Sequence, residues 1–167
     1  MNEIYIAKRR SPDKAIPLLV SHLDDARPFV SSIPPAAQAL IDAFWPGGLT
    51  LVLPIAAGVP SVISPGPGIA VRMPAHPVVL ALIRRLGAPI AATSANVSGQ
   101  PDAVTAAEVI AQLGRRIDMV LDGGATPGLH PSTIVDFTAT PARVLRVGPI
   151  SIEQLREFAP DLDTSHR

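Results

Sequence analysis

Proline and glycine interrupt this chain so often that every apolar stretch in it is short. The sequence holds 19 Pro and 12 Gly among 167 residues, which is high for a globular domain but below the roughly 25–30% of low-complexity disorder. No stretch approaches the ~18–20 unbroken apolar residues of a membrane span. The length fits one compact domain with many turns.

The apolar segments alternate between short runs and helical periods, which indicates an α/β or α+β domain. Short strands are predicted at residues 16–20, 49–53, 69–72, 90–93, 119–121, 132–137 and 143–146. Helices are predicted at residues 34–44 and 78–86, and two more begin at capping boxes formed by Thr105 with Glu108 and by Ser151 with Gln154. Residues 3–7 suit a strand but are too few for their period to decide.

The charge balance and the absence of cysteine exclude several classes of function. Lys plus Arg number 14, as do Asp plus Glu, so the chain lacks the basic excess of a general nucleic-acid coat or a membrane-surface binder. Without Cys there is no disulfide scaffold, thiolate nucleophile or Cys-ligated metal site. The N-terminus carries its positive charge after a short apolar run, the reverse of a secretory signal, so we expect a cytoplasmic protein.

Residues 89–99 form the clearest candidate for a ligand site. An apolar strand there leads into small hydroxyl and amide side chains, among them Ser94 and Asn96, and then into Gly99. Such groups at the end of a strand can bind phosphate, sugar or amino-acid oxygens. The alternative is an ordinary turn in which Ser94 and Asn96 bond to their own backbone.

The basic residues near the N-terminus and Arg72, at the end of a predicted strand, are further candidates. Lys8, Arg9 and Arg10, with Lys14 shortly after, could clamp a polyphosphate or could simply be solvated. Arg72 ends the apolar run of residues 69–71. It could pair with a substrate carboxylate, but a structural salt bridge fits the local sequence equally well.

Glycine-rich residues 122–128 and the hydroxyls of Ser132 and Thr133 make a fourth candidate, because the hydroxyls could face a ligand crevice. Glycine-rich connections can also be plain turns. The sequence lacks the Walker, GxGxxG, HExxH and GxSxG motifs. Its four His residues show no metal-ligand spacing, so no protein metal site is predicted.

Six ordered segments together resemble the YrdC/Sua5 family, whose active members are threonylcarbamoyl-AMP synthases. They are residues 8–10, 44–50, 70–74, 93–99, 131–136 and 145–148, and the resemblance extends over residues 4–158. It implies a twisted, mixed, open α/β sheet with flanking helices around a large, positively lined cavity. We therefore expect a YrdC-like domain over residues 1–159 and a frayed tail over residues 160–167.

The resemblance also implies a nucleotidyltransferase reaction. L-threonine, bicarbonate and ATP would give threonylcarbamoyl-AMP and pyrophosphate for the N6-threonylcarbamoylation of adenosine 37 in tRNA, with other proteins completing that modification. Such chemistry depends on positioning and fixed positive charge, so it needs no protein nucleophile. Mg²⁺ bridging the phosphate oxygens is expected with the ATP.

The motif positions of the family imply roles for individual residues of this chain. Lys8 and Arg10 would be catalytic. The residues implied to face ATP are Arg10, Lys14, Ser94, Asn96 and Arg146. The residues implied to hold threonine are Arg72, Ser132, the backbone around Ala92 and, on weaker grounds, Ser21.

The sequence also departs from the family's pattern. Family members usually begin with a strand–helix segment bearing a motif like P-T-E-T-V-Y-G-L-G, which this sequence lacks, and Arg9 stands where glycine is common. We therefore expect an N-terminally truncated domain of the short, single-domain type, with an exposed sheet edge and exposed apolar surface. Weak or absent activity is expected, with homodimerisation as one compensation.

Two other interpretations remain open. The chain could be a non-catalytic module that binds double-stranded RNA or tRNA or associates with the ribosome, using the pairs Arg84–Arg85 and Arg115–Arg116. Both pairs fall at predicted helix ends, where partners of the helix dipole are the simpler explanation. A decayed remnant with neither activity is the third interpretation.

Overall fold

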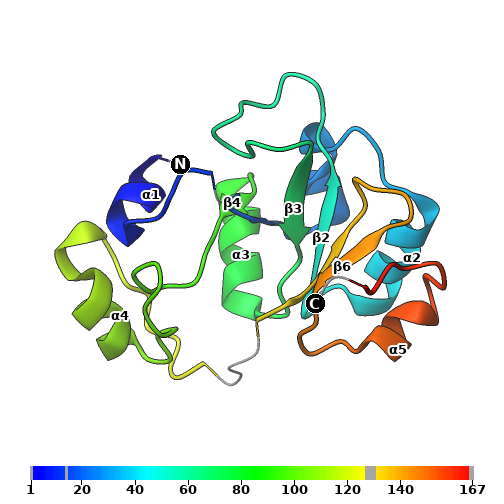
Figure 1. The fold of residues 1–167 in the computed structure, drawn as a ribbon. Helices are drawn as coiled ribbons and strands as arrows, with labels where there is room; N and C mark the ends of the chain where they lie inside the picture. The colour runs from blue at the N-terminus through cyan, green and yellow to red at the C-terminus, as the bar shows by residue number, and fades with distance from the viewer. Residues whose placement is uncertain (1, 14, 127–130, 166–167) are drawn as a thin grey trace. The chain divides into compact units, whose positions relative to one another are not determined.

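The computed structural model describes residues 2–13, 15–126 and 131–165 (Figure 1). The chain forms two compact units where the sequence indicated one domain. The smaller unit comprises Met1–Lys14 and Thr93–Leu129, and the larger unit comprises Ala15–Ala92 and His130–Arg167. Each unit is described by itself.

The larger unit is built on a six-stranded mixed sheet, which confirms the predicted fold class. Its strands are β1 (Leu18–Leu19), β2 (Leu49–Pro54), β3 (Gly68–Arg72), β4 (Ile90–Ala91), β5 (Thr133–Asp136) and β6 (Arg143–Arg146), in the order β4-β1-β3-β2-β5-β6. The pairs β1–β3 and β2–β5 are parallel, and the other neighbouring pairs are antiparallel. The sheet is open, so β4 and β6 are its edges.

Helices of the larger unit follow the predicted apolar spacing. They are α2 (Pro35–Phe44), α3 (Pro77–Leu86) and α5 (Ile152–Arg156), with the short 3-10 helices η1 (Leu23–Asp25) and η2 (Arg27–Phe29). In α2 the residues Ala37, Leu40 and Ile41 are buried and join a core that includes Leu51 and Val71 from the central strands. One apolar face of this helix therefore packs in the sheet's core, as its 3-1-3 spacing requires.

The smaller unit contains α1 (Asn2–Lys8), α4 (Ala106–Leu113) and the 3-10 helix η3 (Gly114–Arg116). Residues 3–7, for which the sequence could not decide between strand and helix, are therefore helical. They lie in α1, which buries Tyr5 and Lys8. The capping box that begins α4 is formed as predicted: the Glu108 amide donates to Thr105 Oγ1 at 3.3 Å, and Glu108 Oε2 accepts from the Thr105 amide. The described residues of this unit thus form helices joined by loops, with no strand among them.

Three predicted strands differ from the structure. Residues 119–121 form no strand, and Met119 is 83% exposed, because β-favouring side chains make a strand only where a partner strand accepts the backbone hydrogen bonds. The strands predicted at residues 16–20 and 90–93 are only two residues long in the structure. These are β1 and β4, which pair with each other over those two residues. In the C-terminal segment the Asp163 amide donates to Ala142 O and the Val144 amide donates to Asp163 O, and the frayed tail expected over residues 160–167 stays a prediction.

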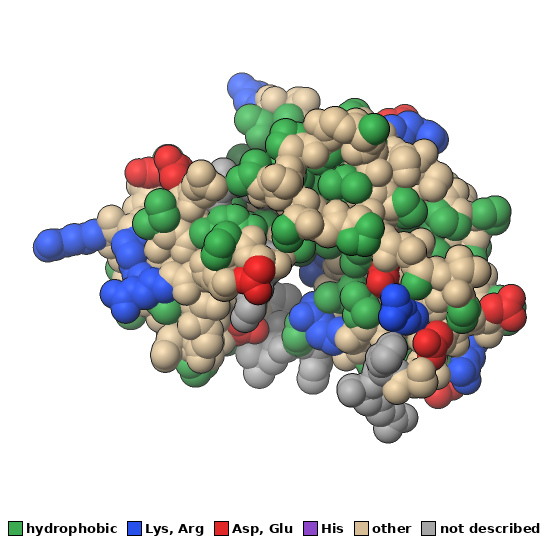
Figure 2. Space-filling view, turned by 45° about the horizontal axis from the view of Figure 1, so that its top comes forward, with side chains coloured by type: hydrophobic (Ala, Val, Ile, Leu, Met, Phe, Trp, Pro, Cys, Tyr) green, Lys and Arg blue, Asp and Glu red, His purple; other side chains and the backbone are tan. Residues whose placement is uncertain are grey.

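Apolar side chains reach the surface at several places, as the green side chains on the face drawn in Figure 2 show. On α3 the exposed residues Val78, Leu82 and Leu86 are spaced four apart and so share one side of the helix. No helix among the described residues is long and apolar enough to cross a membrane.

Candidate functional site

A buried lysine organises the candidate loop of the smaller unit. The Lys8 ammonium donates to Ser94 O, to Asn96 O and, at 3.2 Å, to Asn96 Oδ1. Lys8 is only 4% exposed. An ammonium group has three protons to donate, so these three acceptors can use all of them. We call Lys8, Ser94 and Asn96 the lysine cluster.

Burial lowers the pKa of the Lys8 ammonium, and the positive charge of Arg10 lowers it further, while Asp102 acts in the opposite direction. The guanidinium of Arg10 therefore lies close enough to add positive charge to the lysine cluster. Arg9 is exposed and has a φ of 51°, a left-handed conformation in which glycine is unstrained. Lys14 lies outside the described residues.

Asn96 is the centre of the loop's own hydrogen bonds. Its Oδ1 accepts from Ser94 Oγ at 2.5 Å, and its Nδ2 donates to Gln100 O at 2.6 Å. The bond to Gln100 O is a side-chain-to-backbone bond of the kind that the turn interpretation predicts, but Asn96 also contacts Lys8, 88 residues away in the sequence. Asn96 is buried and Ser94 is exposed, so Ser94 is the residue of the cluster that a ligand can reach.

Arg72 and Arg146 form the main cationic feature of the larger unit. Burial lowers the pKa of Arg72, and the positive charge of Arg146 lowers it further, so the two guanidinium groups lie within range of electrostatic repulsion. Arg146 donates from Nε to Ser132 O at 2.8 Å and from Nη2 to Ser132 Oγ at 3.2 Å. Among the described residues, no carboxylate forms an ion pair with Arg72. Two neighbouring cations of this kind favour an anionic ligand.

Arg72 is also held in place by a hydrogen bond to the turn before β2. Arg72 Nε donates to Gly47 O at 2.9 Å, and the Gly47 amide donates to Met73 O at 2.8 Å. The Trp45 indole N–H closes this turn by donating to Leu49 O. A Cβ on Gly47 would lie 2.3 Å from Phe44 O, so only glycine fits there.

Buried hydroxyl groups complete this arginine cluster, which we define as Arg72, Arg146, Ser132 and Thr50. Thr50 Oγ1 and Ser132 Oγ are 2.7 Å apart, and both residues are buried. Thr133 was expected to face the same crevice, but its hydroxyl instead donates to Ile150 O. Successive residues of an extended chain point to opposite faces, so Ser132 and Thr133 cannot share a face.

The other two residues implied for the threonine side make strong contacts within the protein. Ser21 is buried, and its hydroxyl donates to Asp25 Oδ2 at 2.9 Å and lies 3.0 Å from His22 Nδ1. Burial raises the pKa of Asp25, but hydrogen bonds from the Ser21 amide and hydroxyl and from the His22 amide outweigh it and lower that pKa. The Ala92 amide donates to Pro17 O, so its carbonyl is the backbone group left for a ligand.

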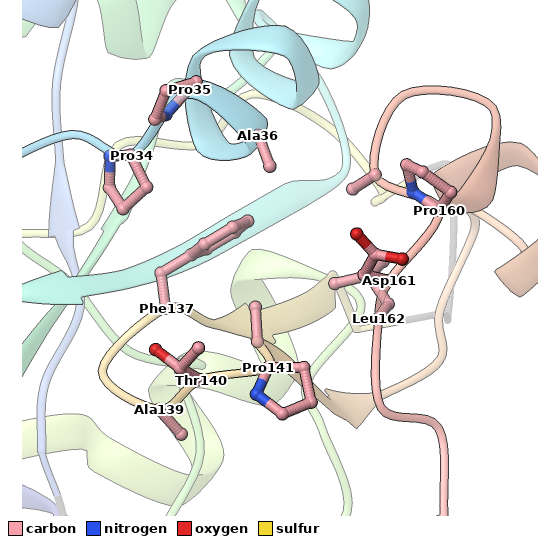
Figure 3. A pocket seen from close by; sticks show the side chains of 12 residues that line it. Pro34, Pro35, Ala36, Phe137, Ala139, Thr140, Pro141, Pro160, Asp161 and Leu162 are labelled. Atoms are coloured by element: carbon pink, nitrogen blue, oxygen red, sulfur yellow. The ribbon is translucent and has the colours of Figure 1, made fainter.

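A separate hollow of about 370 Å³ lies elsewhere on the larger unit (Figure 3). It is lined by the N-terminal end of α2, the β5–β6 connection and the segment after α5, and none of the predicted site residues belongs to it. Phe137 and several prolines surround it, and Asp161 is the charged residue in its lining. This apolar lining with one carboxylate does not suit a polyphosphate.

The structure therefore groups the predicted site residues into two clusters. Lys8, Ser94 and Asn96 meet in the smaller unit, with Arg10 near them, and Arg72, Ser132 and Arg146 meet in the larger unit. Sequence reasoning missed Thr50, because its contact with Ser132 joins residues 82 positions apart. The expectation that both clusters line one cavity stays a prediction.

The arginine pairs proposed to bind RNA lie at the ends of helices, and this position explains their presence without RNA. Arg84 and Arg85 are in the last turn of α3, and Arg116 donates to Gln112 O at the end of α4. Basic side chains are favourable at these positions because they meet the negative end of the helix dipole.

A mixed α/β sheet with cations and buried hydroxyls side by side defines a class of protein suited to binding anionic small molecules. The chain belongs to the Sua5/YciO/YrdC family, whose model, described as "Telomere recombination", matches residues 1–148.

Relatives and one solved structure support this membership. The chain is 38% identical over 163 residues to the threonylcarbamoyl-AMP synthase of Pyrococcus abyssi, covering 97% of this chain and 48% of that protein. It is 41% identical over 152 residues to the putative threonylcarbamoyl-AMP synthase of Mycobacterium tuberculosis strain H37Rv, covering 90% and 70%. The crystal structure of P. abyssi Sua5 complexed with L-threonine matches with a TM-score of 0.91 at 36% identity, covering 97% and 48%. The chain thus spans about half the length of the P. abyssi relative.

Proposed function

We propose that this chain makes threonylcarbamoyl-AMP and pyrophosphate from L-threonine, bicarbonate and ATP. The observation that carries the proposal is the neighbouring pair Arg72 and Arg146 beside the buried Ser132 hydroxyl. The names of the relatives and the L-threonine complex of P. abyssi Sua5 support the choice of substrates.

The arginine cluster suits the carboxylate of threonine. Guanidinium groups bind carboxylates through two parallel hydrogen bonds, and arginine stays charged even where burial lowers its pKa. A bound carboxylate would also offset the repulsion between Arg72 and Arg146. Arg146, which the resemblance assigned to ATP, bonds to Ser132, so we assign it to the threonine side as well. Ser21 and the Ala92 carbonyl are the remaining candidates for threonine's amine and hydroxyl.

The lysine cluster suits the nucleotide. Ser94 is the residue that a ligand can reach, and Arg10 supplies a positive charge for phosphate oxygens. Lys8 donates to loop oxygens, so we assign it the role of holding Ser94 and Asn96 in place, with its charge acting on phosphate at a distance. The catalytic role implied for Lys8 and Arg10 and the ATP contact implied for Lys14 stay predictions.

The proposed reaction needs positioned substrates more than reactive side chains. The threonine amine and bicarbonate give a carbamate and water. A carbamate oxygen then bonds to the α-phosphorus of ATP while the bond to the pyrophosphate oxygen breaks. Negative charge grows on the leaving pyrophosphate, and fixed cations stabilise it.

Among the described residues, no group of three or more His, Asp or Glu side chains could hold a metal ion. Mg²⁺ carried by the phosphates of ATP stays a prediction, and no step of the proposal depends on it.

Pyrophosphate release that requires both threonine and bicarbonate tests the function. Arg72→Met should weaken threonine binding by roughly 10- to 100-fold, since it removes charge-assisted hydrogen bonds. Arg84→Met, on an exposed turn of α3, is the matched control and should behave as the unaltered chain does. ATP-dependent pyrophosphate release that ignores threonine would contradict the proposal. Salt-sensitive tRNA binding without threonine or ATP binding would favour the RNA-binding alternative.

A further inference from the structure

Gln112, in the last turn of α4, forms two hydrogen bonds to the backbone of the loop that carries Ser94 and Asn96. Its Oε1 accepts from the Val97 amide at 3.0 Å, and its Nε2 donates to Pro101 O at 3.0 Å. The backbone partners fix the orientation of the Gln112 amide, because an N–H must meet the oxygen and a carbonyl must meet the NH₂ group.

The two backbone groups bonded by Gln112 each belong to the residue that directly follows one end of the turn made by Asn96. Val97 directly follows Asn96, and Pro101 directly follows Gln100, whose carbonyl accepts from the Asn96 side chain. Gln112 thus bonds to one residue inside that turn, Val97, and to one residue just after it, Pro101. The geometry of Asn96 depends on both ends being fixed.

Lys8 holds the same loop from another element. Besides its side-chain contacts to Ser94 and Asn96, its carbonyl accepts from the Ser98 amide at 2.9 Å. The loop is therefore fastened to α1 by Lys8 and to α4 by Gln112. Since α4 begins at a complete capping box, Gln112 projects from a well-formed helix, which is a firmer support than another loop.

We propose that Gln112 is a positioning residue for the nucleotide: it fixes residues 94–101 so that Ser94 and Asn96 are already in place when ATP binds. This role rests on the proposed function. A loop that is ordered before binding loses less conformational freedom on binding, so its ligand binds more tightly.

The chemistry of the side chain gives a graded test. Glu keeps the acceptor for the Val97 amide but has no N–H for Pro101 O, and Met keeps the length and loses both bonds. We expect the affinity for ATP, measured by calorimetry, to fall about tenfold in Gln112→Met and by less in Gln112→Glu. Threonine affinity should change less than about twofold, because its proposed ligands lie in the larger unit.

Two further readouts separate positioning from general stability. Amide hydrogen exchange at Val97 should speed up in Gln112→Met, since the amide loses its acceptor. Gln38→Met is the matched control, because Gln38 also donates a side-chain hydrogen bond, to Asp42 on α2. It should leave ATP affinity and Val97 exchange unchanged. Melting temperature identifies a variant that fails to fold, in which case Gln112→Glu carries the test.

The outcomes distinguish the two proposals. An unaltered chain that binds no ATP refutes the proposed function and the positioning role together. If the unaltered chain binds ATP and Gln112→Met binds it equally well, only the positioning role is refuted. This holds even if the Val97 amide exchanges faster in the variant. Equal losses of ATP and threonine affinity would also overturn it, because they indicate general damage.

Discussion

Arg146 holds Ser132 by two hydrogen bonds, one to its carbonyl oxygen at 2.8 Å and one to its hydroxyl at 3.2 Å. The guanidinium on β6 is thereby locked onto the residue that precedes β5. The antiparallel pairing of these two strands, which sets Ile134 opposite Arg146, brings the two residues together.

Arg146→Lys should therefore weaken threonine binding more than a conservative exchange normally does. A lysine carries the same charge but cannot make the forked contact to both oxygens of Ser132. We expect threonine affinity, measured by calorimetry, to fall roughly 10- to 100-fold. Arg85→Lys on the exposed end of α3 is the matched control. Full affinity in Arg146→Lys would show that charge alone suffices at this position.

Thr50→Val tests the hydroxyl pair of the arginine cluster. Ser132 Oγ accepts from Arg146, and if it also accepts from Thr50 its own proton is free to donate to an anion. The valine variant removes that partner while keeping the shape of the side chain. We expect about a tenfold loss of threonine affinity, with recovery in Thr50→Ser.

A double-variant comparison supplies the control for Thr50. Thr50 is expected to act on the ligand through Ser132, so Thr50→Val should add little to the loss already caused by Ser132→Ala. Losses that add in full would mean that Thr50 acts on threonine by another route.

The parts of this fold that the sequence predicts are those whose signals are local. The 3-1-3 apolar spacing at residues 34–44 and the capping boxes at Thr105 and Ser151 each produced the expected helix. Residues 119–121 have a strand-like composition but no strand, because a strand depends on a partner that local sequence does not contain. Residues 2–8 carry too short a pattern to separate helix from strand.

The candidate site was predictable in its residue types and not in its contacts. Lys8 was singled out separately from Ser94 and Asn96, and the hydrogen bonds that join it to them span more than 80 positions of sequence. Thr50 and Gln112 gave no local signal, since a threonine in a strand and a glutamine in a helix are ordinary. Their importance comes from the partners that the tertiary fold supplies.

Thr133→Val should destabilise the larger unit. The Thr133 hydroxyl is fully buried, donates to Ile150 O and accepts from the amides of Gly148 and Ile150. Valine would leave two N–H groups and one carbonyl without their partner. We expect a loss of about 3 kcal/mol in the free energy of unfolding, measured by urea denaturation. Thr133→Ser, which keeps the hydroxyl, should recover most of it, and a Thr133→Val chain as stable as the unaltered one would contradict this assignment.

The buried ammonium of Lys8 predicts how stability depends on pH. Burial lowers its pKa in the folded chain below the usual 10.5, so as pH rises the folded state releases this proton before the unfolded state does. The unfolded state then binds more protons, and the free energy of unfolding contributed by Lys8 rises between the lowered pKa and 10.5.

Urea denaturation across that pH range, compared between the unaltered chain and Lys8→Met, isolates this contribution. The difference in the free energy of unfolding should grow in favour of the unaltered chain as pH rises through the window, and it should be constant below the window. Arg9→Met, at the exposed neighbouring position, is the control and should show no such trend. A difference that shrinks with rising pH would mean that the contacts to Ser94 and Asn96 stabilise the charged form more than burial opposes it, so that the pKa of Lys8 is raised.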